Sequence, residues 1–264
     1  MLVLLGVFFA LKKERRVNTV KSSKVLSGLF VALLFVVTAQ TAMTQSTIFN
    51  IPSTDVVAKG KGYFEFDFLP QMPKTASANR LYLYNPRLVV GAGGNVEVGV
   101  NIPAYHASGY TTAFFQPNIK WRFAANDDKG VAGSAGGILV TPLNNRSSLD
   151  SYGLVYANVS KKVKSGNYGP RFTVGPYGIV SGGSSWYGPK GGVILGYEQP
   201  VASKASFVAD WFSGKNGFGY FTPGMSFTLP ANGLLNIGYS LGNDSFDTPH
   251  NNNRALFLYY GVTF

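Results

Sequence analysis

Charged residues of this sequence alternate with large apolar ones. In "GYFEFDF", Glu65 and Asp67 alternate with three phenylalanines. Because successive side chains of a β-strand point to opposite faces, such charges share one face of a sheet and the apolar residues share the other. Charges gathered on one face can line a water-filled passage that selects solutes by size and sign. In segments with this pattern, the charged residues expected to face such a passage, here called the lumen, are Glu65, Asp67, Arg87, Glu97, Lys120, Arg122, Arg171, Glu198, Lys204 and Asp210.

Hairpin geometry predicts which of these charges meet. A turn near residue 108 places Glu97 opposite Lys120 on the same face of two neighbouring strands. The same reasoning brings Glu65 or Asp67 close to Arg87. Two interpretations stay open, a charged constriction that selects solutes and a set of ion pairs that fill and stiffen a small barrel.

Enzyme chemistry has little support. "YHASGY" contains His106 and Ser108, and outer-membrane phospholipase A carries a similar His-x-Ser pattern. The sequence after the serine does not match that family, and no third residue that would orient the imidazole can be placed. Cysteine is absent and histidines do not cluster, so we expect no catalytic residue, no metal site and no cofactor. A lipid hydrolase is retained only as a minor alternative.

Composition argues against an ordinary soluble protein. Charged residues make up only 13% of the 264-residue chain, whereas glycine, tyrosine and phenylalanine are abundant. The formal charge of +11 comes partly from the first 45 residues, which hold six basic residues and one acidic residue. Without a dense basic run, we expect no nucleic-acid partner.

The first 42 residues resemble a leader. "KSSK" is a positive stretch, Val25 to Val37 is apolar, and small residues follow, so a secretory signal cleaved after Ala39 or Ala42 is expected. The charged stretch before it suggests a start placed too early, with the true start near residues 20–21. We expect residues 43–58 to form a periplasmic N-terminal segment and residues 59–264 a barrel.

The rest of the chain divides into twelve alternating segments separated by Gly, Asn, Asp, Pro and Ser. Alternation alone fits either a soluble sandwich or a membrane barrel with its polarity inverted. Short connections alternate with longer ones along the chain. This favours an all-β fold, a closed antiparallel up-and-down transmembrane β-barrel. The predicted strands are 62–68, 81–91, 95–102, 115–123, 133–141, 151–160, 171–180, 191–199, 204–212, 219–228, 234–241 and 255–264.

The chain ends on "RALFLYYGVTF", with apolar residues at alternate positions and a terminal phenylalanine. This ending resembles the C-terminal signature of bacterial outer-membrane proteins, which implies that Tyr260, Val262 and Phe264 are an assembly signal read by the barrel-insertion machinery. "IPSTDVVAKGKGYFEFDF" and "ADWFSGKNGFGYFTPGMSF" are similar to segments of poorly characterised outer-membrane transporters. Residues expected in interfacial aromatic girdles are Trp121, Trp211, Tyr197, Tyr239, Tyr259 and Tyr260.

We therefore expect an outer-membrane channel or transporter of a Gram-negative bacterium, with periplasmic termini, through which small solutes of unknown identity diffuse passively. Its other partners would be the membrane lipid and lipopolysaccharide. The alternative is a non-conducting structural or adhesive barrel that presents its longer loops.

Overall fold

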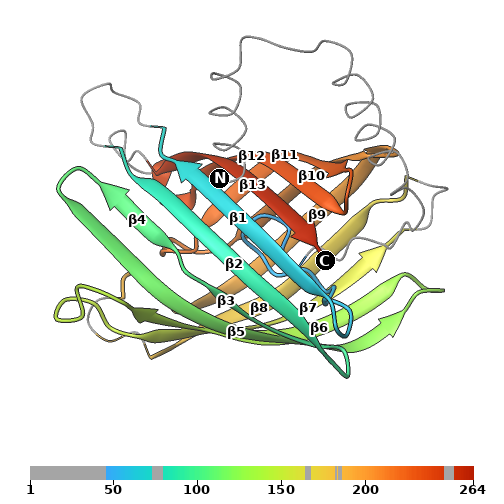
Figure 1. Cartoon of the computed structure of the whole chain (residues 1–264), viewed down its shortest axis with the longest axis horizontal. Coiled ribbons are helices and arrows are strands. Elements are labelled where there is room, and N and C mark those ends of the chain that lie inside the picture. The colour runs from blue at the N-terminus through green and yellow to red at the C-terminus, as the bar shows by residue number, and fades with distance from the viewer. Residues whose placement is uncertain (1–45, 73–79, 164–167, 182, 184–185, 247–252) are drawn as a thin grey trace, which may run out of the picture. The chain divides into compact units, whose positions relative to one another are not determined.

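A computed structural model describes residues 46–72, 80–163, 168–181, 183, 186–246 and 253–264. The predicted leader, residues 1–42, lies outside this range. Antiparallel strands follow one another around a closed wall (Figure 1). The strands are β1 (Gly62–Pro70), β2 (Tyr82–Gly93), β3 (Val96–Asn101), β4 (Ala104–Ala107), β5 (Tyr110–Asn126), β6 (Val131–Pro142), β7 (Tyr152–Lys162), β8 (Arg171–Ser181), β9 (Gly191–Ala202), β10 (Ala205–Phe212), β11 (Tyr220–Leu229), β12 (Gly233–Gly242) and β13 (Arg254–Thr263), with a short 3-10 helix η1 (Asn243–Phe246).

The wall has twelve strands, because β3 and β4 are two parts of one. Both pair with β2 on one side and with β5 on the other. Ile102 and Pro103 interrupt them, and proline has no N–H to donate to the ladder. The carbonyl of Pro103 still accepts a hydrogen bond from the backbone N–H of Phe114 at 3.0 Å. The prediction of twelve strands is confirmed.

The barrel closes where the last strand meets the first. On β1, Glu65 lies opposite Gly261 of β13 and opposite Arg87 of β2. Gly62 and Phe264 exchange two backbone hydrogen bonds of 2.9 Å. Closure removes the free sheet edges, as a barrel in lipid requires.

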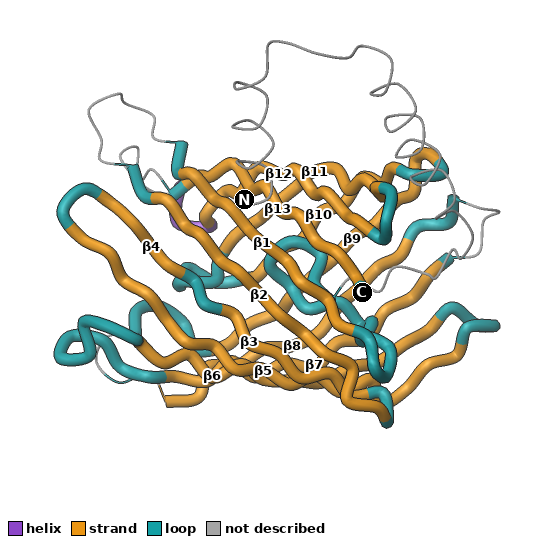
Figure 2. Tube along the Cα trace, in the orientation of Figure 1, coloured by secondary structure: helices purple, strands orange, loops and turns teal. Residues whose placement is uncertain are grey.

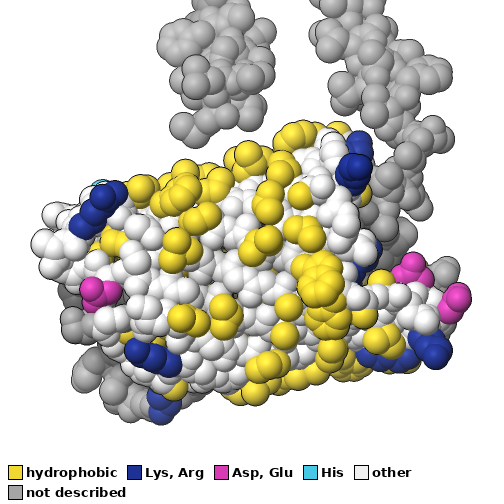
Figure 3. Space-filling model, turned by 90° about the horizontal axis from the view of Figure 1, so that it is seen from below, with side chains coloured by type: hydrophobic (Ala, Val, Ile, Leu, Met, Phe, Trp, Pro, Cys, Tyr) yellow, Lys and Arg dark blue, Asp and Glu magenta, His cyan; other side chains and the backbone are white. Residues whose placement is uncertain are grey.

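Polarity is inverted relative to a soluble sandwich. Phe64 and Phe66 are exposed on the outside of β1, whereas Glu65 and Asp67 are buried on the inside. Figure 3 shows hydrophobic side chains across the middle of one outer face and charged ones toward its two ends. Such an apolar band between charged rims suits a barrel that spans a bilayer. Within the described part of the chain, no helix is long and apolar enough to cross a membrane.

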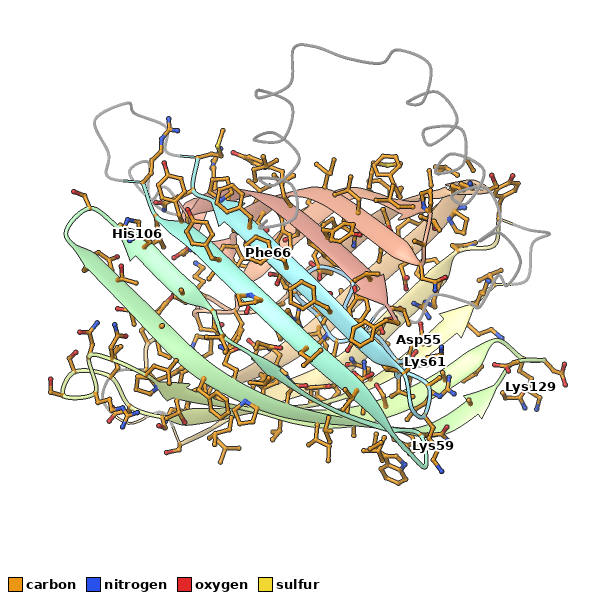
Figure 4. The ribbon with its side chains drawn as sticks, viewed as in Figure 1. Asp55, Lys59, Lys61, Phe66, His106 and Lys129 are labelled. Atoms are coloured by element: carbon orange, nitrogen blue, oxygen red, sulfur yellow. The ribbon has the colours of Figure 1, made fainter. Side chains whose placement is uncertain are left out.

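The two ends of the barrel differ. One, the short-turn end, carries the connections after β2, β5, β9 and β11, the end of β7, the start of β8 and the C-terminus (Figure 2). The other, the long-loop end, carries residues 143–151 and 213–219 and the tight turn after β4. The end of β1 and the start of β2 also lie here, as do the ends of β8 and β12 and the starts of β9 and β13. Lys59, Lys61 and Lys129 lie at the first end and His106 at the second (Figure 4). The predicted alternation of short and long connections is present with two exceptions, the tight turn after β4 and the longer connection, residues 163–170 in the sequence, between β7 and β8.

Candidate functional site: a charged lumen that holds an N-terminal hairpin

Strands β1 and β2 contribute a cluster of charges to the interior. Arg87 lies 2.5 Å from Glu65 and 3.6 Å from Asp67. The amide of Asn85 donates to Asp67 at 2.7 Å. Both carboxylates are almost fully buried, so the shared guanidinium compensates charge that water does not reach. The predicted proximity of Glu65 and Asp67 to Arg87 is confirmed.

Glu97 and Lys120 form a second buried pair. They are directly opposite each other on β3 and β5, and Lys120 Nζ lies 2.9 Å from Glu97 Oε1. Each residue is 2% exposed. The pairing predicted from the turn near residue 108 is confirmed. An exposed ion pair would contribute little to stability, whereas the loss of either partner here would leave a buried charge uncompensated.

A third group joins three elements. Arg171 of β8 donates two hydrogen bonds to Glu198 of β9, at 2.5 and 2.8 Å, and its Nη1 lies 2.6 Å from Asp55. Asp55 comes before the first strand, so this pair binds the N-terminal segment to the barrel wall.

Residues 46–57 form a hairpin inside the barrel. Thr47 pairs with Pro52 in an antiparallel bridge, and Ser53 N–H donates to the carbonyl of Ser46 at 3.0 Å. In Figure 1 this blue segment lies behind β1 and β2, within the ring of strands. The described part of residues 43–58 is therefore enclosed by the barrel, which corrects the expectation of a separate periplasmic segment. The reason is that its polar and apolar groups both find partners on the inner wall.

Asp210 of β10 binds the tip of the hairpin. Its Oδ2 accepts backbone N–H groups from Phe49, Asn50 and Ile51 at 2.9, 2.5 and 2.9 Å. The side chain of Asn50 donates to Thr222 at 2.8 Å. Three converging N–H groups are an anion site made of main chain, and Asp210 is 1% exposed.

Other wall residues bind the two arms of the hairpin. Asn158 donates to the carbonyl of Pro52 at 2.7 Å, and the hydroxyls of Thr54 and Ser160 are 2.6 Å apart. Near the open end of the hairpin, Lys120 donates to the carbonyl of Ser46 at 2.8 Å. Glu97 accepts from Ser46 Oγ at 2.5 Å and from Val57 N–H at 2.7 Å.

Glycines on the inner wall make room for the apolar side chains of the hairpin. A Cβ added at Gly196 would lie 2.5 Å from Ile48 and 2.8 Å from Ile51. One added at Gly224 or Gly238 would lie 2.6 or 2.7 Å from the ring of Phe49. We call these three positions the glycine sockets. All three hairpin side chains are at most 1% exposed, so they fill the sockets completely.

Of the two remaining predicted lumen residues, Lys204 is placed differently and Arg122 lies on the predicted face. Lys204 is exposed in the turn before β10, so its assignment to the lumen is wrong. The predicted strand started one residue too early, which placed a turn residue on a strand face. Arg122 lies between the exposed Trp121 and Phe123, hence on the inner face of β5, and its Nε has no hydrogen-bond partner in the described structure.

Tyr259 is also placed differently from its prediction. It is 1% exposed on the inner face of β13 and hydrogen bonds to the hydroxyl of Tyr63 at 2.9 Å, so it does not belong to an outer girdle. Tyr260, the next residue, faces outward, and Phe264 is exposed at the end of the chain. Val262 shares their register and is partly exposed. The sequence reasoning missed that the same strand carries tyrosines on both faces.

Aromatic side chains gather at the long-loop end. Trp186 packs edge-on against Tyr152 with ring centroids 5.0 Å apart, and also contacts Phe218 at 6.2 Å. Tyr187 is the next residue after Trp186, and partial burial together with the carboxylate of Asp244 in η1 raises its pKa. These rings pack on one another at the long-loop end.

The residues considered for hydrolysis lie at this end too. His106 Nδ1 hydrogen bonds with Thr111 Oγ1 at 2.8 Å, and both residues are exposed on neighbouring strands. The partner shown for the imidazole is therefore a threonine across the β4–β5 pair and not Ser108. Among the described residues, no group of three or more His, Cys, Asp or Glu side chains could hold a metal ion.

Comparison with known proteins gives similarity at the level of the fold. No protein-family model matches the sequence, and no match was found among curated proteins. An outer membrane channel from Pseudomonas putida F1 aligns with a TM-score of 0.50 at 13% identity, over 86% of this chain and 100% of that chain. The translocator domain of the autotransporter NalP from Neisseria meningitidis gives a TM-score of 0.36 at 12% identity, over 77% and 87% of the two chains. From its strand order, its inverted polarity and the first of these similarities, the chain is a closed twelve-stranded β-barrel of the outer-membrane type.

Proposed function

We propose that this protein is an outer-membrane channel through which small solutes diffuse passively. The observation that supports this most is the inner face, where ion pairs and polar side chains from β1 to β12 surround a lumen enclosed by an apolar outer band. Twelve strands enclose a wider space than the eight-stranded barrels that their own side chains fill. Charges on such a lining select solutes by size and sign.

The same proposal places the barrel in the outer membrane of a Gram-negative bacterium, in contact with lipid and lipopolysaccharide. The short-turn end and both termini would face the periplasm, because short periplasmic turns and longer outer loops are usual for such barrels. The insertion machinery would read the outward-facing Tyr260, Val262 and Phe264. No catalytic chemistry and no cofactor are part of this function.

A second candidate is a non-conducting barrel that presents its long loops. The observation in its favour is that the hairpin occupies the lumen and that Glu97, Lys120 and Arg171 bind it as well as one another. The two candidates differ in whether ions cross the lumen.

Single-channel recording in a planar bilayer separates them. The refolded protein, with folding checked by the mobility of unheated samples on a gel, should give discrete conductance steps. Arg122→Gln removes a charge from the inner face and should shift the reversal potential measured in a salt gradient. Lys204→Gln removes the same charge from an exposed turn and is the matched control. Silence from well-folded protein under all conditions would refute the channel and favour the non-conducting barrel.

A further inference from the structure

Asp210 stands apart from the other lumen carboxylates. Glu65, Asp67, Glu97 and Glu198 each have a lysine or arginine within 4.0 Å. In the part of the chain that the structure describes, no ion pair involves Asp210, although it is 1% exposed. Its charge is met by donors of the hairpin, namely three backbone N–H groups and the side-chain amide of Asn50. A buried carboxylate without a cation depends on such donors.

The hairpin is joined to the barrel by a separate turn. Lys61 N–H donates to the carbonyl of Ala58, and Gly60 lies in the left-handed region at φ 75°. A Cβ at Gly60 would meet nothing within 4 Å, so the turn is open on its outer side. None of the hydrogen bonds between the hairpin and the wall belongs to the strand pairing that closes the barrel. Release of the hairpin about the turn 58–61 would therefore break none of the strand pairing that closes the wall.

The groups that the hairpin places against Asp210 and Gly196 indicate what kind of ligand could bind there. Three N–H donors converge on one carboxylate, and the branched side chains of Ile48 and Ile51 fill the socket at Gly196 beside it. Gly196 is directly opposite Asp210 in the pairing of β9 with β10. A primary ammonium group also offers three N–H donors. A small ammonium ion with a branched aliphatic group would reproduce both features at once.

We propose that residues 46–57 are a removable gate, and that its departure uncovers at Asp210 and Gly196 a binding site for small branched aliphatic ammonium ions. This inference rests on the proposed channel function. While the gate is docked, its main chain occupies the ammonium position. Once it leaves, Thr222 and Ser240, whose hydroxyls are 2.7 Å apart on the neighbouring strands, extend the site with neutral hydrogen-bonding groups.

The chain allows a direct test of the gate because it contains no cysteine. The hydroxyls of Thr54 and Ser160 are 2.6 Å apart, close to the separation of about 2 Å between bonded sulfurs. The time-averaged conductance of the oxidised Thr54→Cys/Ser160→Cys protein should be at least tenfold lower than that of the reduced protein, and reduction should restore it. Each single cysteine variant, treated identically, is the control. Equal conductance of the oxidised and reduced double variant would overturn the gate.

Isobutylammonium chloride probes the binding site, with tetramethylammonium chloride as a cation of similar size that has no N–H donor. Wild-type protein should favour isobutylammonium in reversal-potential measurements. Asp210→Asn should raise the open probability at least tenfold and abolish this preference, whereas Asp128→Asn, in the exposed turn after β5, should change neither. Persistence of the preference in Asp210→Asn would overturn the assigned site.

Gly196→Ala keeps the charge but places a methyl group against Ile48 and Ile51. It should open the channel, and it should weaken the preference for isobutylammonium because the methyl group fills the socket assigned to the branched chain. This variant keeps the gate testable if Asp210→Asn fails to fold. An unchanged open probability in Gly196→Ala would count against docking at the socket. If neither the wild type nor the reduced double-cysteine variant nor Gly196→Ala conducts, the channel function itself fails, which is distinct from failure of the gate.

Discussion

The pair formed by Glu97 and Lys120 is the sharpest test of how the lumen charges stabilise the barrel. Replacing Glu97 by Gln keeps the shape of the side chain but leaves the ammonium of Lys120, whose side chain is 3% exposed, without its opposing charge. Breaking a buried pair in this way costs about 3–5 kcal/mol. At roughly 1.4 kcal/mol for each factor of ten, the ratio of folded to unfolded protein should fall by more than about a hundredfold.

The second substitution decides whether this cost comes from an uncompensated charge. Glu97→Gln combined with Lys120→Met removes both charges and keeps similar volume, so at least half of the lost stability should return. Recovery should be incomplete. Ser46 Oγ and Val57 N–H donate to different oxygens of Glu97, and glutamine offers only one acceptor oxygen, so one of these donors loses its acceptor. The carbonyl of Ser46 also loses the ammonium of Lys120.

Urea unfolding in lipid vesicles, followed by tryptophan fluorescence and by gel mobility, measures these differences. Lys204→Met, in an exposed turn, controls for the exchange of lysine for methionine and should change the free energy of unfolding little. The reasoning is refuted if the double variant is as unstable as the sum of its two single variants, because the buried charge would then not be the source of the loss.

Two further predictions test the wall itself. Ile119→Lys puts a charge on the outer face of β5, where the native side chain is 52% exposed. It should lower the free energy of unfolding by about 2–4 kcal/mol near the bilayer midplane. Asn118→Lys, one residue away on the inner face, should fold in vesicles nearly as well as wild type. Equal loss in both would contradict the inverted polarity. Gly224→Ala places a Cβ 2.3 Å from the backbone carbonyl of Ile237. It should lower the free energy of unfolding by about 1–3 kcal/mol and so lower the urea midpoint. Gly196→Ala meets the ends of flexible side chains, and Thr173 at 3.3 Å, so it should lower the midpoint less. The opposite order would contradict the expectation that a clash with the wall backbone at Gly224 costs more than a clash with hairpin side chains at Gly196.

The barrel could be predicted from sequence because its rules are local. Alternation with a period of two marks each strand, and the turn after Ala107 fixes the register that brings Glu97 opposite Lys120. Errors arose where a segment boundary decided the answer. Lys204 was assigned to a strand that begins at Ala205, and one residue is enough to move a side chain from a wall to a turn.

The position of the hairpin could not be predicted, because its partners are distant in sequence. Pro52 meets Asn158, and the turn at Asn50 meets Asp210, across more than a hundred residues. No periodicity reports such contacts. Two signals were present but ambiguous. The segment "STIFNIPSTDVV" contains apolar residues that belong to no strand, and glycine replaces side chains at inner positions such as Gly196 and Gly238.

Those glycines show that the wall and its occupant obey different energetics. The wall places its apolar face in lipid and satisfies its backbone through strand pairing, and neither contribution involves the hairpin. The lumen would contain water without the hairpin, so burying Ile48, Phe49 and Ile51 there does gain from the hydrophobic effect. Ordering the hairpin opposes that gain through lost conformational entropy. The two contributions can therefore be altered separately, and a change in the sockets or at Asp210 can release the hairpin from a barrel that remains closed.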